Sequence, residues 1–296
     1  MNARSIFAIL AAAAALPAAA DTALDQRKAA QADGVVDISN VAGSVEVVGW
    51  DRNEVQLTGS YEDGVERVEF EVRGDRTVIR VHLPRNQRNN RKGDADLVVH
   101  VPRGSRVTAS TVSASLQAEN LAGAPELRSV SGDVTVAGTF TRAELQAVSG
   151  TVRVGGTGQG ARISASAVSG DVLIERMHGE ISASSVSGAV RVSSADVARA
   201  ELSSVSGEAE YAGALAATGV YELSTVSGEA RLVVHGAAKA TYDLESAASG
   251  DIRNAFGPKP QRKSEYGPGM ELRFSEGDGA EVRMDTVSGT LVLDRK

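Results

Sequence analysis

Acidic residues recur at one position of a repeated sequence motif, and a column of carboxylates is one way to hold a cation. Five acidic residues directly follow a Ser-Gly pair: Asp133, Asp171, Glu208, Glu229 and Asp251. The last three of them fall on successive copies of the motif. Copies stacked about 4.8 Å apart would bring like charges close together, so the column needs a cation or neighbouring positive charges. Arg191, Arg231 and Arg253 lie two residues beyond this position. We expect compensated surface charges; the alternative, calcium binding, lacks the nonapeptide calcium-binding repeat.

Serines recur in the same motif and raise the question of nucleophilic catalysis. A serine nucleophile needs a neighbouring base and an oxyanion site, and repetition in every copy argues for a structural role instead. The histidines have no ligand-like spacing and are interpreted as structural or incidental: His82, His100, His178 and His235. The glycine-rich stretch 155–160 lacks the lysine and helix of a phosphate loop, so we predict a turn. The sequence therefore predicts no catalytic residue, no cofactor and no metal site.

A polysaccharide-cleaving enzyme is the catalytic alternative, because some β-helix proteins cleave acidic polysaccharides. Such sites need clustered carboxylates with a basic residue in a groove. The nearest candidates are Asp243 and Glu245 beside Asp251, which are equally well explained as surface charges. We predict that the chain is not an enzyme.

The repeated motif itself, Val-Ser-Gly or a close variant, predicts the architecture. Successive serines from Ser131 to Ser249 are 18, 20, 18, 19, 21 and 22 residues apart, which suits one turn of a β-solenoid. We predict an all-β fold, a single-stranded parallel β-helix with about 18–22 residues per coil. The structural repeat comprises these pairs: Ser131 and Gly132, Ser149 and Gly150, Ser169 and Gly170, Ser187 and Gly188, Ser206 and Gly207, Ser227 and Gly228, Ser249 and Gly250, Ser288 and Gly289.

Two strands flank each motif. The third and fifth residues after the serine are apolar, as in Val134 and Val136, and so are the sixth and fourth residues before it, as in Ile163 and Ala165. Both sets alternate with polar residues, so we expect them to point inward. At the valine before each serine the alternation of inward and outward positions changes phase, which indicates a bend between the two strands. The glycine after the serine suits close packing between coils.

The chain divides into six segments in this interpretation. They are a signal peptide at 1–20, a linker at 21–34, an irregular N-terminal β part at 35–105, regular coils at 106–253, a loop insertion at 254–279 and a terminal coil at 280–296. The signal peptide is indicated by Arg4, an apolar run from Ile6 to Leu16, and Ala18-Ala19-Ala20 before Asp21. A charged loop from Arg85 to Asp96 interrupts the N-terminal part.

Composition limits the expected binding partners and the expected cellular location of the protein. The chain has no cysteine, which excludes disulfides, thiolate metal sites and a lipid-modified N-terminal cysteine. Without the signal peptide, 30 basic and 38 acidic side chains leave a net charge of −8, so nucleic acid is not an expected partner. No segment after the signal approaches the roughly 20 apolar residues of a membrane span. We expect an exported protein, either periplasmic or at the cell surface or secreted, of undetermined oligomeric state.

The chain resembles the bacterial putative-adhesin family of uncharacterised β-solenoid domains from about Val35 to its end. The resemblance rests on three stretches: residues 40–47 (NVAGSVEV), residues 97–104 (LVVHVPRG), and the Thr/Ser-Val-Ser-Gly series that closes at residues 286–289. It implies a single-chain, right-handed β-helix, exported in many bacteria and named an adhesin largely by analogy. Ala114 in place of glycine and Ala248 in place of valine depart from the pattern. The family supplies no catalytic residues.

The sequence thus favours an exported, non-enzymatic scaffold that binds an envelope protein, a glycan or a surface. Long loops on a rigid solenoid are common binding sites, so the loop from Arg85 to Asp96 is a candidate surface. The other candidates are basic or aromatic residues of the repeat and of the insertion: Arg191, Arg231, Arg253, Lys259, Arg262, Lys263 and Tyr266. The alternative of another class is a structural or sensing periplasmic protein without an external ligand.

Overall fold

The computed structural model describes residues 22–84, 93–156, 160–195, 197–237, 239–264 and 267–296, and all the regular elements among them are β-strands. None of these residues forms a helix of the length and apolarity needed to cross a membrane. The expected signal peptide, residues 85–92 of the charged loop, residues 157–159 of the glycine-rich stretch, and Tyr266 lie outside the described residues.

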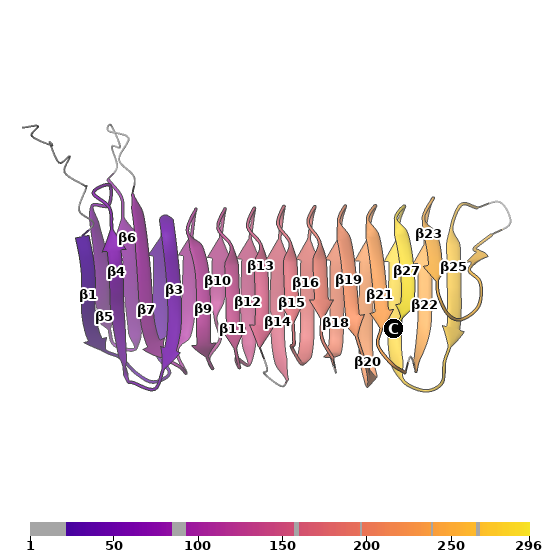
Figure 1. The fold of residues 1–296 in the computed structure, drawn as a ribbon, viewed down its shortest axis with the longest axis horizontal. Coiled ribbons are helices and arrows are strands. Elements are labelled where there is room, and N and C mark those ends of the chain that lie inside the picture. Colours follow the sequence, from indigo (N-terminus) through magenta and orange to yellow (C-terminus); the bar gives the residue numbers. More distant parts are fainter. Residues whose placement is uncertain (1–21, 85–92, 157–159, 196, 238, 265–266) are drawn as a thin grey trace, which may run out of the picture.

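The strands form two sheets, drawn in Figure 1 as one long row. In spatial order, the 13-stranded sheet A consists of β1 (Thr22–Ala29), β4 (Glu54–Tyr61), β7 (Asp94–Pro102), β3 (Ala42–Trp50), β9 (Ser115–Leu121), β11 (Val134–Gly138), β13 (Val152–Gly156), β15 (Val172–Glu175), β17 (Val190–Ser193), β19 (Glu208–Gly213), β21 (Glu229–Val234), β27 (Thr290–Arg295) and β23 (Asp251–Asn254). The 14-stranded sheet B consists of β24 (Gln261–Arg262), β25 (Met270–Ser275), β22 (Ala240–Ser246), β26 (Ala280–Thr286), β20 (Leu215–Thr225), β18 (Val197–Ser204), β16 (Gly179–Ser185), β14 (Ala161–Ala167), β12 (Arg142–Ala147), β10 (Glu126–Ser129), β8 (Arg106–Thr111), β2 (Val35–Asn40), β6 (Arg76–His82) and β5 (Arg67–Arg73).

Each regular coil gives one strand to sheet B and the next strand to sheet A, which confirms the β-solenoid. Equivalent residues stack in register: Val152 of β13 pairs with Val134 on one side and with Val172 on the other, both in parallel. The strand before the motif behaves in the same way, since Ile163 of β14 pairs with Ile181 of β16. The right-handed sense of the coil stays a prediction.

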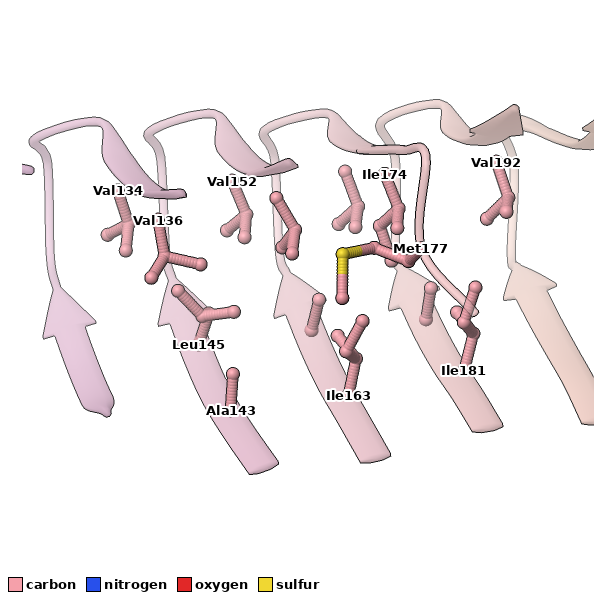
Figure 2. Close-up of a cluster of buried hydrophobic side chains, with 14 of the residues drawn as sticks. Val134, Val136, Ala143, Leu145, Val152, Ile163, Ile174, Met177, Ile181 and Val192 are labelled. Carbon is pink, nitrogen blue, oxygen red and sulfur yellow. The ribbon is translucent and has the colours of Figure 1, made fainter. Parts of the chain in front are cut away.

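The core lies between the two sheets, where the residues expected to point inward meet. Val134, Val136, Ile163 and Ala165 are at most 2% exposed, so the predicted period-two pattern is confirmed. Figure 2 shows the valines of sheet A directed toward Leu145, Ile163 and Ile181 of sheet B. Each buried valine or leucine stabilises the fold by roughly 1.5–3 kcal/mol, and small side chains suffice because the two layers are close.

The coil that ends the chain does not end the stack. β26 pairs with both β20 and β22, and β27 pairs with both β21 and β23. Figure 1 shows yellow β27 between β21 and β23. The insertion at 254–279 is more ordered than a loop, because β25 pairs antiparallel with β22 and β24 pairs antiparallel with β25. These strands cover the end of sheet B.

The N-terminal end has a similar arrangement. β2 lies between β6 and β8, and β3 lies between β7 and β9, so the coil formed by β2 and β3 is inside the stack. Antiparallel strands extend each sheet outward, with β1 next to β4 and β5 next to β6. Residues 21–34, expected to be a linker, therefore contain an edge strand. β1 shows little apolar alternation because it is mostly exposed. Its position depends on backbone pairing with β4 and on polar contacts such as that of Lys28 Nζ, which donates to the Phe70 carbonyl at 2.6 Å.

Candidate binding surfaces

The Val-Ser-Gly motif forms one corner of every regular coil, between sheet B and sheet A. The serine N–H donates to the carbonyl of the preceding coil's motif valine, as from Ser187 to Val168 at 3.0 Å and from Ser206 to Val186 at 3.0 Å. The same contact recurs for Ser131, Ser149, Ser169, Ser227 and Ser288, whereas in the coil of Ser249 the N–H of Ala248 donates to the Val287 carbonyl. A fixed backbone bond at each step keeps equivalent residues in line along the solenoid.

A buried hydroxyl completes this corner. Ser204, just before the motif valine, is 3% exposed; its Oγ accepts the N–H of Gly207 at 3.0 Å and donates to the carbonyl of Gly188 at 3.1 Å. In other coils the glycine N–H donates to an equivalent hydroxyl, which belongs to Ser129, Ser185, Thr225 or Thr286. This role was not predicted from the sequence, although Ser or Thr recurs directly before Val-Ser-Gly in several copies of the motif.

The motif valines point out of the protein and form a continuous ridge. Among the described residues, all the large hydrophobic side chains that are exposed belong to this set, each at 44–47%: Val112, Val130, Val148, Val168, Val186, Val205, Val226 and Val287. They lie on eight consecutive coils, so the ridge is about 34 Å long at about 4.8 Å per coil. We call these eight residues the valine ridge.

The arginines predicted to compensate the acidic column do so. The shortest ion pairs at this face join Arg191 Nη2 to Glu208 at 2.5 Å and Arg231 to Glu229 and Asp294, both at 2.7 Å. The hydrogen bonds that Arg231 donates to Glu229 raise the pKa of the Arg231 side chain. In the same column Arg253 pairs with Asp251 at 3.1 Å. The face formed by these residues is thus one of paired charges, as expected.

One detail of this column was wrong in the sequence interpretation. Glu229 and Asp251 were placed on consecutive coils, but both residues pair with Thr290 of β27, which lies between them. The inserted coil separates the two carboxylates by two steps of the stack. Their mutual repulsion is correspondingly weaker than the sequence order suggested. Glu210 lies two residues beyond Glu208 on β19. Burial raises the pKa of the Glu210 carboxyl, and the hydrogen bond and negative charge of Glu208 raise it further.

The basic residues of the insertion lie at the C-terminal end of sheet B. Lys259 lines a small cavity of about 200 Å³ together with Gln261, Glu271 and Arg273. Arg262 is exposed in β24, whereas Lys263 pairs with Glu245 at 2.9 Å. The structure therefore does not bring Arg191, Arg231 and the insertion residues into one site.

The carboxylates considered for polysaccharide cleavage do not converge. Asp243 and Glu245 are on β22 of sheet B, and both pair with Arg273 at 2.9 Å. Asp251 is exposed on β23 of sheet A. The two strands belong to different sheets, and their buried residues, such as Leu244 and Ile252, lie in the core between those sheets. Within the described ranges, no group of three or more His, Asp or Glu residues is placed to hold a metal ion.

A depression of about 430 Å³ lies at the corner opposite the motif. Its lining residues come from four consecutive coils and include one arginine and two histidines: Arg176, His178, Ser193, Ser194, Ala195, Ala212, Gly213, Ala214 and His235. Arg176 and His178 follow β15, and His235 follows β21, three coil steps or about 14 Å further along. Between them the floor consists of small side chains. We call this feature the turn depression.

The turn that carries Arg176 and His178 is anchored in the core. Met177 between them is fully buried, and Figure 2 shows its side chain among Ile163, Ile174 and Ile181. Its N–H donates to Ser194 Oγ at 2.9 Å, while the Arg176 N–H donates to the Ser193 carbonyl at 3.0 Å. Arg176 also has a positive φ of 55°, which is uncommon for a residue with a side chain. Both basic side chains therefore project from a fixed backbone.

Charge distinguishes this depression from the paired face. None of the nine lining residues that the structure describes is acidic, and the ion pairs between described residues do not include Arg176. Asp196, which follows the lining residue Ala195 in the sequence, lies outside the described residues. The other two histidines have partners elsewhere: His82 contacts Glu69 at 2.7 Å, and the His100 ring lies 5.0 Å from that of Trp50. Sequence analysis missed this site because its residues are far apart in the chain.

Comparison with known proteins places the fold. A family model described as Toastrack DUF4097 matches residues 19–293. No curated protein matches the chain. Among solved structures, a putative adhesin from Parabacteroides merdae ATCC 43184 is 9% identical, with a TM-score of 0.38, and the match covers 91% of this chain and 95% of that chain.

Two proteins from Parabacteroides distasonis ATCC 8503 are also similar. A putative adhesin is 11% identical with a TM-score of 0.38, and the match covers 93% of this chain and 98% of that chain. A putative lipid binding protein is 10% identical with a TM-score of 0.36, and the match covers 93% and 96%. These likenesses carry no argument about ligands.

Proposed function

Since this chain belongs to the Toastrack DUF4097 family, we propose that it is an exported, non-enzymatic β-solenoid that binds an anionic ligand at the cell envelope. The observation that carries this proposal is the turn depression, a concave site with Arg176, His178 and His235 along its length. A ligand that carries carboxylate or phosphate groups matches this charge. Acidic envelope glycans have such groups on a chain long enough to span it.

The geometry supports binding by an extended ligand. The Arg176 turn and His235 are about 14 Å apart, a distance that a few sugar units span. Guanidinium groups bind carboxylates and phosphates through two parallel hydrogen bonds, which gives direction as well as charge. The floor of Ala195, Ala212 and Ala214 leaves room above the backbone. Because Met177 and Ser194 hold the Arg176 turn, little order has to be gained on binding.

A scaffold role fits the rest of the surface. The carboxylates that could serve as acids or bases, such as Asp243 and Glu245, are already paired with Arg273. In this proposal residues 1–20 are the export signal and the adhesin-like role is binding at the envelope. The basic residues of the insertion, including Lys259 and Arg262, form a separate surface at the C-terminal end.

Binding can be tested with an oligogalacturonate as the anionic probe and a neutral maltodextrin of similar length as its control. Arg176→Gln is expected to weaken oligogalacturonate binding by about tenfold or more, because it removes the charged hydrogen bonds. Arg153→Gln makes the same change in charge on the outer face of β13 and should leave binding unaltered. Equal affinity for the two variants, or for the two sugars, would contradict the proposal.

Location needs its own measurement. Protease treatment of intact cells, compared with cells whose outer membrane has been opened, separates a surface protein from a periplasmic one. Digestion on intact cells supports binding to external glycans. Protection until the membrane is opened supports an envelope ligand inside it. Detection in the cytoplasm alone would refute export.

A further inference from the structure

The valine ridge has no role in the proposed ligand site, because it lies along the opposite corner of the coils. Each of its eight valines is 44–47% exposed. Together they present on the order of 500 Å² of apolar surface, which is at the upper end of what a soluble monomer exposes. Water contact with a patch of this size is unfavourable, so a partner that covers it gains the hydrophobic free energy.

We propose that the valine ridge is the contact surface between two copies of this chain, packed side by side in a two-fold dimer. The first argument is the repeat distance. A partner that contacts every valine must present apolar groups at the same spacing of about 4.8 Å over eight steps. A second copy of the ridge has that spacing by construction. Each valine of one copy then fits between two valines of the other.

The second argument is charge. The chain is acidic overall, so two copies repel each other across most of their surfaces. Along the middle of the ridge, however, the adjacent positions are uncharged serines: Ser166, Ser184, Ser203 and Ser224 toward sheet B, and Ser169, Ser187, Ser206 and Ser227 toward sheet A. Glu208 and Glu229 lie beyond these serines and are paired with arginines. This strip is where identical acidic chains can approach closely.

The third argument is area and extent. A standard interface buries about 800 Å² on each partner, and the ridge with its flanking serines offers a surface of that order. The ridge also stops at both ends: at the equivalent position the next coil has Ala247 at one end and half-buried Val41 at the other. A finite, straight ridge favours a closed two-fold pair over an open chain of subunits.

The test is the molecular mass of the purified protein in solution, measured by sedimentation. The expected result is a dimer with a micromolar or tighter Kd. The double variant Val168→Glu with Val186→Glu should raise that Kd by about 100-fold or more, because it places four like charges in the contact. The matched control, Ser164→Glu with Ser182→Glu, adds the same charges to the outer face of the same two coils and should remain dimeric. Circular dichroism of each variant checks that the fold is retained.

A second measurement uses the absence of cysteine from the chain. A single cysteine in the ridge, Val186→Cys, should cross-link two copies with a short bifunctional maleimide, whereas Ser182→Cys should not. A monomeric wild-type protein would overturn the proposal. So would a ridge variant that stays dimeric, since the contact would then lie elsewhere, for example at the exposed edge of β1. Both results are independent of ligand binding at the turn depression.

Discussion

The two corners of each coil differ in the regularity of their contacts. At the Val-Ser-Gly corner the serine N–H to valine carbonyl bond recurs from the coil of Ser131 to that of Ser288, and a buried hydroxyl accepts the glycine N–H in five of these coils. At the opposite corner the turns differ in length and conformation, with positive φ at Asn120, Arg176 and Gly236. Figure 1 shows the contrast as a row of similar hooks along one long edge and unequal turns along the other.

This difference shows how a repeat protein combines stability with a specific site. One corner repeats, so each coil is held to the next by the same bonds, and any exposed residue there becomes a ladder. The other corner is free to vary because the neighbouring coil constrains it less. The turn depression formed there, from residues that the repeat does not specify. The valine ridge formed at the repeating corner for the opposite reason.

The largest expected effect tests how tightly the repeating corner is packed. A Cβ on Gly188 would lie 2.0 Å from the backbone oxygen of Gly170, so Gly188→Ala must push two coils apart. We expect a loss of about 3 kcal/mol or more in unfolding free energy, measured with urea. Gly236→Ala, at the variable corner, meets no atom within 4 Å and has only its φ of 83° to strain it, about 1–2 kcal/mol. Equal losses would erase the distinction between the corners.

A smaller effect tests the buried hydroxyl. Ser204→Ala leaves the Gly207 N–H and the Gly188 carbonyl without their partner, which costs about 1–3 kcal/mol. The exposed motif residue of the same coil is the control. Ser206 Oγ donates to the Val186 carbonyl at 3.3 Å in contact with water, so Ser206→Ala should cost less than about 0.5 kcal/mol. If thermal denaturation gives the reverse order, the buried hydroxyl is not what fixes the corner.

The smallest effect concerns Asp285, which replaces the serine found beside the ridge in the central coils. Burial raises the pKa of Asp285, and Arg283 only partly opposes this. A raised pKa in the folded state means that the ionised form destabilises the protein above that pKa, and that the penalty disappears as the pH falls toward the unfolded value near 3.9. Asp285→Ser should therefore raise stability at neutral pH by less than about 1 kcal/mol, because the side chain is half exposed. The stability gained by this substitution should vanish in acid. A gain that persists in acid would show that the raised pKa of Asp285 is not its cause.

Much of the fold was predictable because it is local and repeated. The alternation of Val134 and Val136, and of Ile163 and Ala165, gave the inward faces, and the burial of these residues confirms it. The pairing of Arg231 with Glu229 also followed from spacing alone. The order of coils at the ends was not predictable in this way. Nothing in the residues around Ser288 indicates that its coil inserts next to β21 and not after β23.

The candidate sites also differ in how far the sequence could predict them. The sequence by itself determined the coil length, the inward positions and the existence of ladders, because each depends on residues within one repeat and on the fixed rise between strands. Tertiary structure alone decided that the motif valines face water and that Arg176, His178 and His235 share a depression. Those facts depend on the direction of each corner and on the relative lengths of turns several coils apart, which a local pattern does not encode.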